Sequence, residues 1–287
     1  MGSAELGSAV KLWLPAIAAG LLAVACSSVA GPAQPARQPP LSEPTSPTIT
    51  PPYGPSPTGT PSPGPRSPKP LAGMIVGIDP GHNGRNGTDP AYLNRLIWNG
   101  RESETCDTTG TQTAGGYTEA RFNFNVARYL RADLRSAGAR VVMTRTNNHG
   151  VGPCVNRRAQ ILDRAHADVA IDIHADGGPV WGRGFTVLEP VADGPNNHVI
   201  GSSALFGNDV RLALLRHTGM PVSDYYGSNG IQLRDDLAGL NLTTVPKVLI
   251  ECGNMQNPND ARLLTSPRFQ RRLAAALEAA IVTFLMG

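Results

Sequence analysis

Short apolar runs alternate with longer segments that are apolar on one side only, from residue 71 to the end of the sequence. The short runs predict buried strands, and the one-sided segments predict helices. The predicted strands are residues 74–79, 141–144, 169–174, 185–188 and 247–251. The predicted helices are residues 118–137, 155–165, 203–217 and 266–285. This alternation predicts a single α/β domain with a mostly parallel central sheet flanked by helices on both faces.

Two polar segments interrupt this pattern. Residues 83–117 are rich in Gly and Thr and show no helical or strand period, so we expect a long loop that is functional or flexible. Residues 234–241 carry a short run of charges. They are interpreted either as a loop at the rim of a cleft or as an ordinary solvated surface.

The first 70 residues have a different composition. Residues 31–70 are dominated by Pro, with Ser, Thr and Gly filling most other positions. Such a segment has almost no apolar surface to bury, so we expect a disordered tether. The predicted organisation is therefore a signal segment over residues 1–30, the tether over 31–70 and a catalytic domain over 71–287.

The signal segment has the features of an export signal. Lys11 precedes an apolar run over residues 12–25, which is too short for a comfortable bilayer span but typical of a signal peptide. The run ends in Ala-Val-Ala-Cys-Ser-Ser, where two interpretations stay open. Cys26 is either the acylated residue of a lipoprotein signal, which would anchor the protein to the membrane, or part of an ordinary cleavage region. Both predict an exported protein of the periplasm or cell wall.

The overall charge excludes one class of partner. The sequence carries 25 Lys and Arg against 22 Asp and Glu, for a formal net charge of +3. This mild balance tolerates an anionic polymer as substrate, but the sequence shows no clustered basic stripe of the kind that nucleic-acid binding requires. No heptad pattern indicates an obligate assembly, so we expect a monomer.

Candidate chemistry gathers at the carboxyl ends of the predicted strands, where parallel sheets place their sites. Asp79 and His82 follow the first strand, His174 ends the third and Glu251 ends the last, while Glu119 opens a helix. Two histidines and a glutamate from separate segments can hold a zinc ion with an open coordination position. A further glutamate can then take a proton from the attacking water.

Each of these side chains also has a simpler interpretation. His82 can cap a turn, and His174 can be a buried core histidine. Glu119 in a first helical turn is favoured by the helix dipole in any case. Glu251 is the hardest to dismiss, because a carboxylate that ends an apolar strand is costly unless it is paired or functional.

Four sequence motifs, in order, carry a resemblance to a known family. They are Ile-Asp-Pro-Gly-His-Asn at 78–83, Tyr-Thr-Glu at 117–119, Arg158 with Ile-His-Ala-Asp at 173–176, and Val-Leu-Ile-Glu-Cys-Gly-Asn at 248–254. This set resembles the zinc-dependent N-acetylmuramoyl-L-alanine amidases of the type-3 amidase family. The Gly-Pro-Cys segment at 152–154 is similar to one in small single-domain members of mycobacterial type.

The resemblance implies a function and a role for each candidate residue. His82, Glu119 and His174 would bind one Zn²⁺ ion, and Glu251 would be the general base. The substrate would be peptidoglycan or a muropeptide, cut at the amide between N-acetylmuramic acid and L-alanine. Two other functions stay open: a wall-binding lipoprotein without activity, and a zinc peptidase that cuts within the stem peptide.

Three further residues are candidates for supporting roles. Asp172 stands where many family members carry Ser, and strand alternation places it on the same face as His174. It either supports that histidine by a hydrogen bond or pairs with a basic residue. Arg158 is interpreted as a buried cation paired to a carboxylate in preference to a substrate contact, and Asp79 as a supporting carboxylate.

The cysteines predict one disulfide. Cys106 and Cys154 both fall in predicted loops of a chain bound for an oxidising compartment, so we expect them to pair. Cys252 lies beside Glu251 on a predicted strand and is expected to be buried. The spacing of the four cysteines excludes a Cys-x-x-Cys zinc ribbon.

Overall fold

The five predicted apolar runs and one strand that was not predicted, over residues 231–234, form a six-stranded sheet in the computed structural model, which describes residues 69–287. The predicted signal, Cys26 and almost all of the predicted tether lie outside the described residues. The strands, in their spatial order, are β4 (Arg140–Met143), β1 (Ile75–Pro80), β5 (Val169–Asp176), β8 (Lys247–Asn254), β6 (Thr186–Pro190) and β7 (Ile231–Arg234).

The sheet is mostly parallel, as predicted. Strands β4, β1, β5 and β8 run in one direction, whereas β6 pairs antiparallel with β8 and β7 runs parallel to β6. The register places His174 of β5 directly beside Glu251 of β8, and Thr186 of β6 on the other side of Glu251. Two of the candidate residues are therefore brought together by strand pairing alone.

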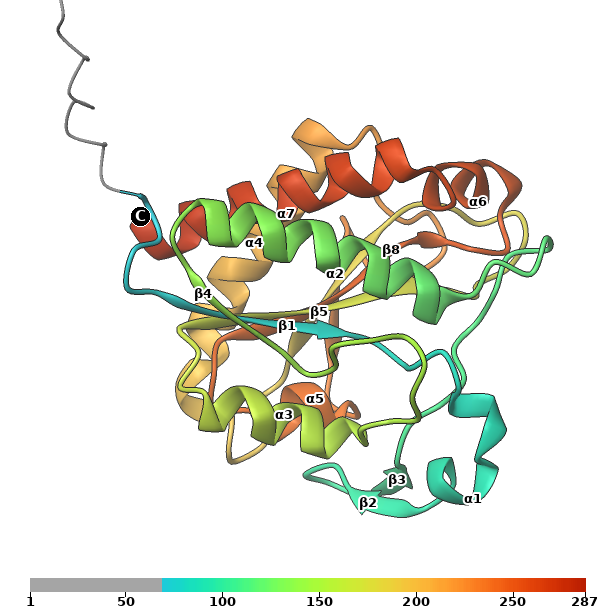
Figure 1. Ribbon diagram of the computed structural model, residues 1–287, viewed down its shortest axis with the longest axis horizontal. Helices are drawn as coiled ribbons and strands as arrows, with labels where there is room; N and C mark the ends of the chain where they lie inside the picture. The colour runs from blue at the N-terminus through green and yellow to red at the C-terminus, as the bar shows by residue number, and fades with distance from the viewer. Residues whose placement is uncertain (1–68) are drawn as a thin grey trace, which may run out of the picture. The chain divides into compact units, whose positions relative to one another are not determined.

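Helices cover both faces of the sheet, which confirms the predicted layers (Figure 1). The helices α2 (Glu119–Ser136), α4 (Ile200–His217) and α7 (Pro267–Met286) lie on one face, where α7 packs against both α2 and α4. The other face carries α3 (Val155–Arg164) and the short α5 (Ala238–Asn241). A further helix, α6 (Pro258–Leu264), follows β8. No helix among residues 69–287 combines the length and the apolar character needed to span a bilayer.

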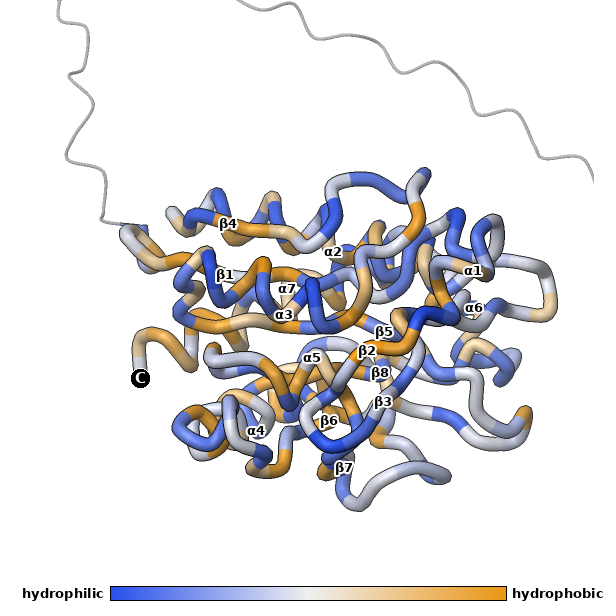
Figure 2. Tube along the Cα trace, turned by 90° about the horizontal axis from the view of Figure 1, so that it is seen from below, coloured by the Kyte–Doolittle hydropathy of each residue, from blue (hydrophilic) through white to orange (hydrophobic). Residues whose placement is uncertain are grey.

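The main core lies between the sheet and the helices α2, α4 and α7. The apolar stripe of α2 at Phe122, Val126, Leu130 and Leu134 is fully buried there. A smaller cluster around Leu162 lies under α3. Figure 2 shows hydrophobic residues concentrated in the strands of the central sheet and hydrophilic residues in many of the connecting loops.

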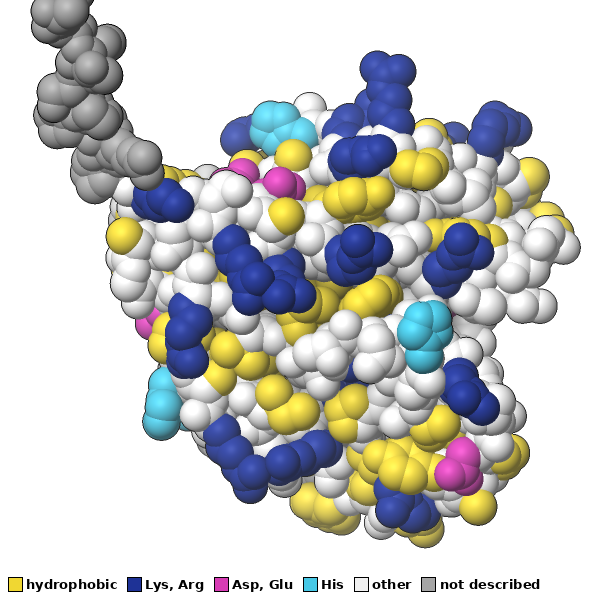
Figure 3. All heavy atoms as spheres, viewed as in Figure 1, with side chains coloured by type: hydrophobic (Ala, Val, Ile, Leu, Met, Phe, Trp, Pro, Cys, Tyr) yellow, Lys and Arg dark blue, Asp and Glu magenta, His cyan; other side chains and the backbone are white. Residues whose placement is uncertain are grey.

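The surface above α2 and α7 carries much of the exposed positive charge (Figure 3). On α2, Arg121, Arg128 and Arg135 are exposed, and on α7 Arg271 and Arg272 are exposed. Buried apolar residues separate the three arginines of α2 in the sequence, whereas Arg271 and Arg272 are adjacent. The mild basic balance of the chain is therefore spread over this face as separate side chains.

The segment 83–117 is more ordered than the sequence analysis expects. It contains a 3-10 turn (Asn86–Thr88), the helix α1 (Pro90–Leu93) and an antiparallel hairpin of β2 (Leu96–Trp98) and β3 (Ser103–Thr105). The two strands are too short for their alternation to stand out in the sequence. The charged segment 234–241 is likewise not all loop, since it includes the end of β7 and the whole of α5.

A disulfide ties this segment to the rest of the domain. Cys106, directly after β3, is bonded to Cys154, directly before α3, as the sequence predicted. By closing a loop of 48 residues, the bond is expected to stabilise the fold by about 3–4 kcal/mol. Cys252 is buried and forms no disulfide within the described part of the chain.

Candidate metal centre

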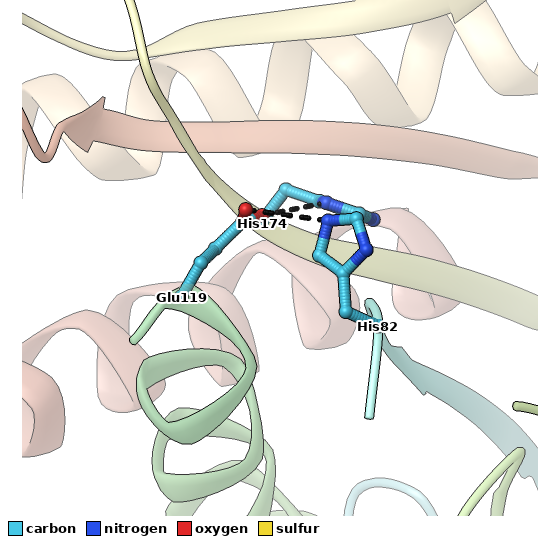
Figure 4. A group of neighbouring side chains, drawn as sticks. All are labelled: His82, Glu119 and His174. Carbon is cyan, nitrogen blue, oxygen red and sulfur yellow. Dashed lines mark hydrogen bonds and ion pairs between the residues drawn. The ribbon is translucent and has the colours of Figure 1, made fainter. Parts of the chain in front are cut away.

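Three separate segments bring His82, Glu119 and His174 together (Figure 4). His82 follows the end of β1, His174 lies near the end of the neighbouring β5, and Glu119 is the first residue of α2. Gly81 allows the close approach of β1 and β5, because a Cβ atom there would lie 2.1 Å from Nε2 of His174. The three residues thus meet at the carboxyl edge of the sheet.

The backbone around His82 is held in an unusual conformation. Its φ of 56° lies in the left-handed region, which non-glycine residues rarely adopt. The buried guanidinium of Arg158 donates a hydrogen bond of 2.9 Å to the carbonyl of His82. Strained conformations of this kind persist where surrounding contacts enforce them, commonly at functional sites.

The geometry of the three side chains fits a metal ion. Oε2 of Glu119 lies 3.2 Å from Nε2 of His82, and Oε1 of Glu119 lies 2.8 Å from Nδ1 of His174. One possible ligand atom from each residue lies within 4.8 Å of the others. Two imidazole nitrogens and one carboxylate oxygen are a usual zinc donor set for a site that keeps an open position.

The charges of the cluster also fit a cation. Burial alone would lower the pKa of His82, but the carboxylates of Glu119 and Asp107 raise it to about 9. Burial opposes the charged form of His174 too, yet Asp172 and Glu119 raise its pKa well above the usual value. The surrounding carboxylates therefore favour positive charge, such as a bound proton, at both rings. A metal ion takes its ligands in their deprotonated forms, so its binding would displace such protons.

Each histidine has a carboxylate at its other ring nitrogen. Nδ1 of His82 lies 3.1 Å from Oδ1 of Asp107, and Nε2 of His174 lies 3.3 Å from Oδ1 of Asp172. Carboxylates in this position fix the tautomer and the orientation of metal-binding imidazoles and raise their basicity. The two nitrogens that face Glu119 are thereby left as the atoms that could hold a metal ion.

A row of buried charges joins these two carboxylates; the five residues Asp107, Arg158, Asp79, Lys247 and Asp172 form what we call the charge row. Arg158 pairs with Asp107 and with Asp79, at 3.0 Å in each case. Lys247 pairs with Asp79 at 2.9 Å and with Asp172 at 3.4 Å. The signs alternate along the row, so every buried charge has an opposite neighbour, as burial requires.

The three supporting candidates from the sequence analysis, Asp172, Arg158 and Asp79, all lie in the charge row. Asp172 pairs with a basic residue, Lys247, at 3.4 Å, and its other oxygen lies 3.3 Å from Nε2 of His174 as an ion-pair contact without hydrogen-bond geometry. Arg158 is almost fully buried and paired to carboxylates. Asp79 is buried between Arg158 and Lys247 and makes no contact with either histidine.

Sequence reasoning missed three residues. Asp107 and Lys247 complete the charge row, and the buried Arg145 donates to the carbonyls of Gly81 and Ala120 at 3.2 and 2.8 Å. Arg145 thereby joins the segment that carries His82 to the start of α2. The signal for Lys247 was its place at the start of an apolar strand, where a charge needs buried partners. Nothing in the sequence indicates which partners those are.

A cleft of about 250 Å³ opens in front of the cluster. Its lining includes the three clustered residues together with Thr111, Asp176, Arg234, Leu237 and Glu251. One oxygen of Glu251, Oε2, is buried and has no hydrogen-bond partner in the described residues. Burial raises the pKa of Glu251 to about 8. In its deprotonated form, a carboxylate with a raised pKa beside a candidate metal site is a strong acceptor for a proton from a water molecule.

Comparison with known proteins identifies the family. The family model described as N-acetylmuramoyl-L-alanine amidase matches residues 76–283. The N-acetylmuramoyl-L-alanine amidase Rv3717 of Mycobacterium tuberculosis is 39% identical over 221 residues, which cover 76% of this chain and 89% of that protein.

Solved structures agree with this comparison. The amidase Ami1 of Mycobacterium smegmatis is similar at 41% identity and a TM-score of 0.71, over 75% of this chain and 98% of that one. Ami1 of Mycobacterium abscessus is similar at 40% identity and the same TM-score, over 75% of this chain and 100% of that one. By sequence, fold and coverage, the chain belongs to the type-3 family of N-acetylmuramoyl-L-alanine amidases.

Proposed function

We propose that the protein is a zinc hydrolase of peptidoglycan that cleaves the amide between N-acetylmuramic acid and the L-alanine of the stem peptide. The observation that carries the proposal is the pairing of a His-Glu-His cluster with the unpartnered carboxylate of Glu251 in one cleft. Membership of the amidase family supports the bond that is cut.

The metal-binding cluster, Glu251 and the charge row each have a separate role in the proposed reaction. His82, Glu119 and His174 would hold one Zn²⁺ ion, which supplies a Lewis acid for the amide carbonyl and lowers the pKa of a water molecule. Glu251 takes the proton from the attacking water and delivers it to the departing L-alanine nitrogen. The charge row keeps both imidazoles oriented while the proton moves.

The proposal extends to the rest of the chain. A peptidoglycan substrate requires export, which agrees with residues 1–30 acting as a signal and residues 31–70 as a tether to a catalytic domain over 71–287. Acylation of Cys26, with anchoring to the membrane, and a monomeric state remain part of the proposal.

Two other functions predict different results. A wall-binding protein without activity does not need a general base, so the presence of Glu251 in the cleft favours a hydrolase. A zinc peptidase would use the same metal site and differ in the bond that is cut. Mass spectrometry of the products separates all three.

The test is cleavage of purified muropeptides by the oxidised protein, loaded with zinc or treated with a chelator. We expect zinc-loaded protein to release intact stem peptides from the sugar, the chelator to abolish release, and added zinc to restore it. Products cut within the stem would indicate the peptidase. A folded, zinc-loaded protein that binds muropeptides without cutting them would indicate the binding protein.

Replacement of Asp172 tests the support of His174. Asp172→Asn keeps the shape of the side chain but removes the negative charge 3.3 Å from Nε2 of His174, so we expect zinc affinity to fall by about tenfold, at the lower end of the usual 10–100-fold range for such partners. Competition with a chelating dye measures the change. Asp209→Asn, on α4 and without an ion pair in the described chain, is the control. Equal zinc affinity in both variants would contradict the proposed role.

A further inference from the structure

The loop after β3 carries a carboxylate whose two oxygens are both engaged. Oδ1 of Asp107 lies 3.1 Å from Nδ1 of His82 and accepts from the backbone N–H of Thr108 at 2.7 Å. Oδ2 accepts from Arg158 at 3.0 Å. Asp107 is buried, with a side chain only 3% exposed. Its position is therefore set from two sides.

Two oxygens of Thr108 also lie near Nδ1 of His82 and compete with Asp107 as hydrogen-bond acceptors. The carbonyl of Thr108 also lies 3.1 Å away, and the Thr108 hydroxyl lies 3.3 Å away. The carbonyl already accepts from Asn86 at 2.6 Å. The carboxylate is the one charged acceptor of the three, and charge-assisted hydrogen bonds are roughly twice as strong as neutral ones. Asp107 is thus the dominant partner of this nitrogen.

The disulfide fastens the segments that carry Asp107 and its partner. Cys106 directly precedes Asp107. Cys154 directly precedes the helix α3, which carries Arg158. The carbonyl of Cys106 accepts from Val155 at 2.8 Å, so backbone and disulfide contacts reinforce each other. The residue before Cys154, Pro153, also contacts Arg158, because its backbone carbonyl accepts a hydrogen bond from the guanidinium at 2.9 Å.

We propose that Asp107 is the positioning residue for His82, and that the Cys106–Cys154 disulfide acts on the metal centre through it. The inference rests on the zinc site of the proposed function. A loop that is free to shift would carry Asp107 away from Nδ1, since a displacement of about 1 Å already breaks a hydrogen bond of 3.1 Å. The disulfide thus contributes to metal retention as well as to stability of the fold.

The alternative is that Asp107 only balances the buried charge of Arg158. In that case its replacement would lower stability without a specific effect on the metal. Asp260 offers the matched comparison, because it is fully buried and pairs with Arg183 at 3.0 Å but contacts none of the three clustered residues. Asp260→Asn therefore removes a buried carboxylate from a pair with a partly exposed arginine elsewhere in the fold.

The experiment compares zinc dissociation constants of the whole protein, carrying Asp107→Asn or Asp260→Asn, by chelator competition at a temperature where both are folded. We expect Asp107→Asn to weaken zinc binding by about 10–100-fold and Asp260→Asn to change it less than twofold. The absorption bands of the Co²⁺-loaded protein, which report ligand geometry, should change in Asp107→Asn alone. Similar zinc constants and unchanged Co²⁺ bands in Asp107→Asn would overturn the inference.

A cycle of variants tests the part of the disulfide. Cys106→Ser with Cys154→Ser should weaken zinc binding, and adding Asp107→Asn to that background should have a smaller effect than it has in the oxidised protein. Fully additive effects would show that the disulfide acts on the metal by another route and would overturn that part. Failure of the unsubstituted protein to bind zinc would overturn the zinc site itself, whereas zinc binding without muropeptide cleavage would overturn only the proposed reaction.

Discussion

Glu251→Gln is expected to lower kcat for muropeptide hydrolysis by about 10²–10⁴-fold while zinc affinity stays within about twofold. Glutamine keeps the size of the side chain but cannot take a proton from water. Oε2 of Glu251 has no protein partner in the described chain, so the substitution removes no hydrogen bond from the fold. Burial of an uncharged amide in place of a carboxylate should leave stability unchanged or raise it slightly.

The control for Glu251 is another buried glutamate on the neighbouring strand. Glu189 on β6 is 8% exposed, and its side chain faces Gly207 of α4 and not the cleft. Glu189→Gln should retain activity within about twofold of the unsubstituted protein. Stopped assays on a single muropeptide, with zinc content measured on the same samples, give both numbers. Retention of more than a tenth of the activity by Glu251→Gln would exclude it as the general base.

Asp79→Asn is expected to lower the free energy of unfolding by about 3–5 kcal/mol at pH 7. Asp79 is the shared anion of the charge row, and its removal leaves Arg158 and Lys247 each with one fewer buried counter-charge. Lys247 is fully buried, so it cannot turn to water instead. Urea unfolding followed by circular dichroism measures the loss, with Asp209→Asn expected to change stability by less than about 0.5 kcal/mol.

The pH dependence of this loss has a defined sign. Burial on its own would raise the pKa of Asp79, but Lys247 and Arg158 hold it well below its usual value. A carboxylate with a depressed pKa stabilises the fold above the unfolded-state pKa of about 4 and loses this contribution as pH falls below it. The difference between Asp79→Asn and the unsubstituted protein should therefore be constant from pH 5 to 7 and narrow below pH 4. A gap that widens in acid would contradict the assigned role.

Much of the layout of the site could be predicted because three of the candidate residues stand at the end of an apolar run. His82, His174 and Glu251 each follow or end a buried run, and parallel strands bring such ends to one edge. The antiparallel direction of β6 could not be predicted, because an apolar run is equally apolar in either direction. The strand β7 was not predicted at all, because its Ile-Gln-Leu-Arg sequence is too short for the alternation to stand out. The direction became visible only through the pairing of β6 with β8 and of β7 with β6.

The partners of the charged residues could not be predicted either. Lys247 and Asp79 are 168 positions apart. From the sequence alone, many other carboxylates are equally plausible partners for Lys247. Asp107 lay in a segment without a period, so nothing marked it as the neighbour of His82. Such pairings depend on the three-dimensional path of the chain, which periodicity within single elements does not specify.

Both ends of the described chain lie beside the amino end of β1 (Figure 1), where Leu71 donates to the carbonyl of Ala137 at the close of α2. The cleft lies at the opposite edge, because it is built from carboxyl ends of the same strands. Anything attached at either end of the domain, such as a bead, a fused reporter or a surface, therefore leaves the cleft pointing outward. In protein that is immobilised through either end, the cleft should accordingly stay open to substrates that are too large to enter the space between the protein and its support.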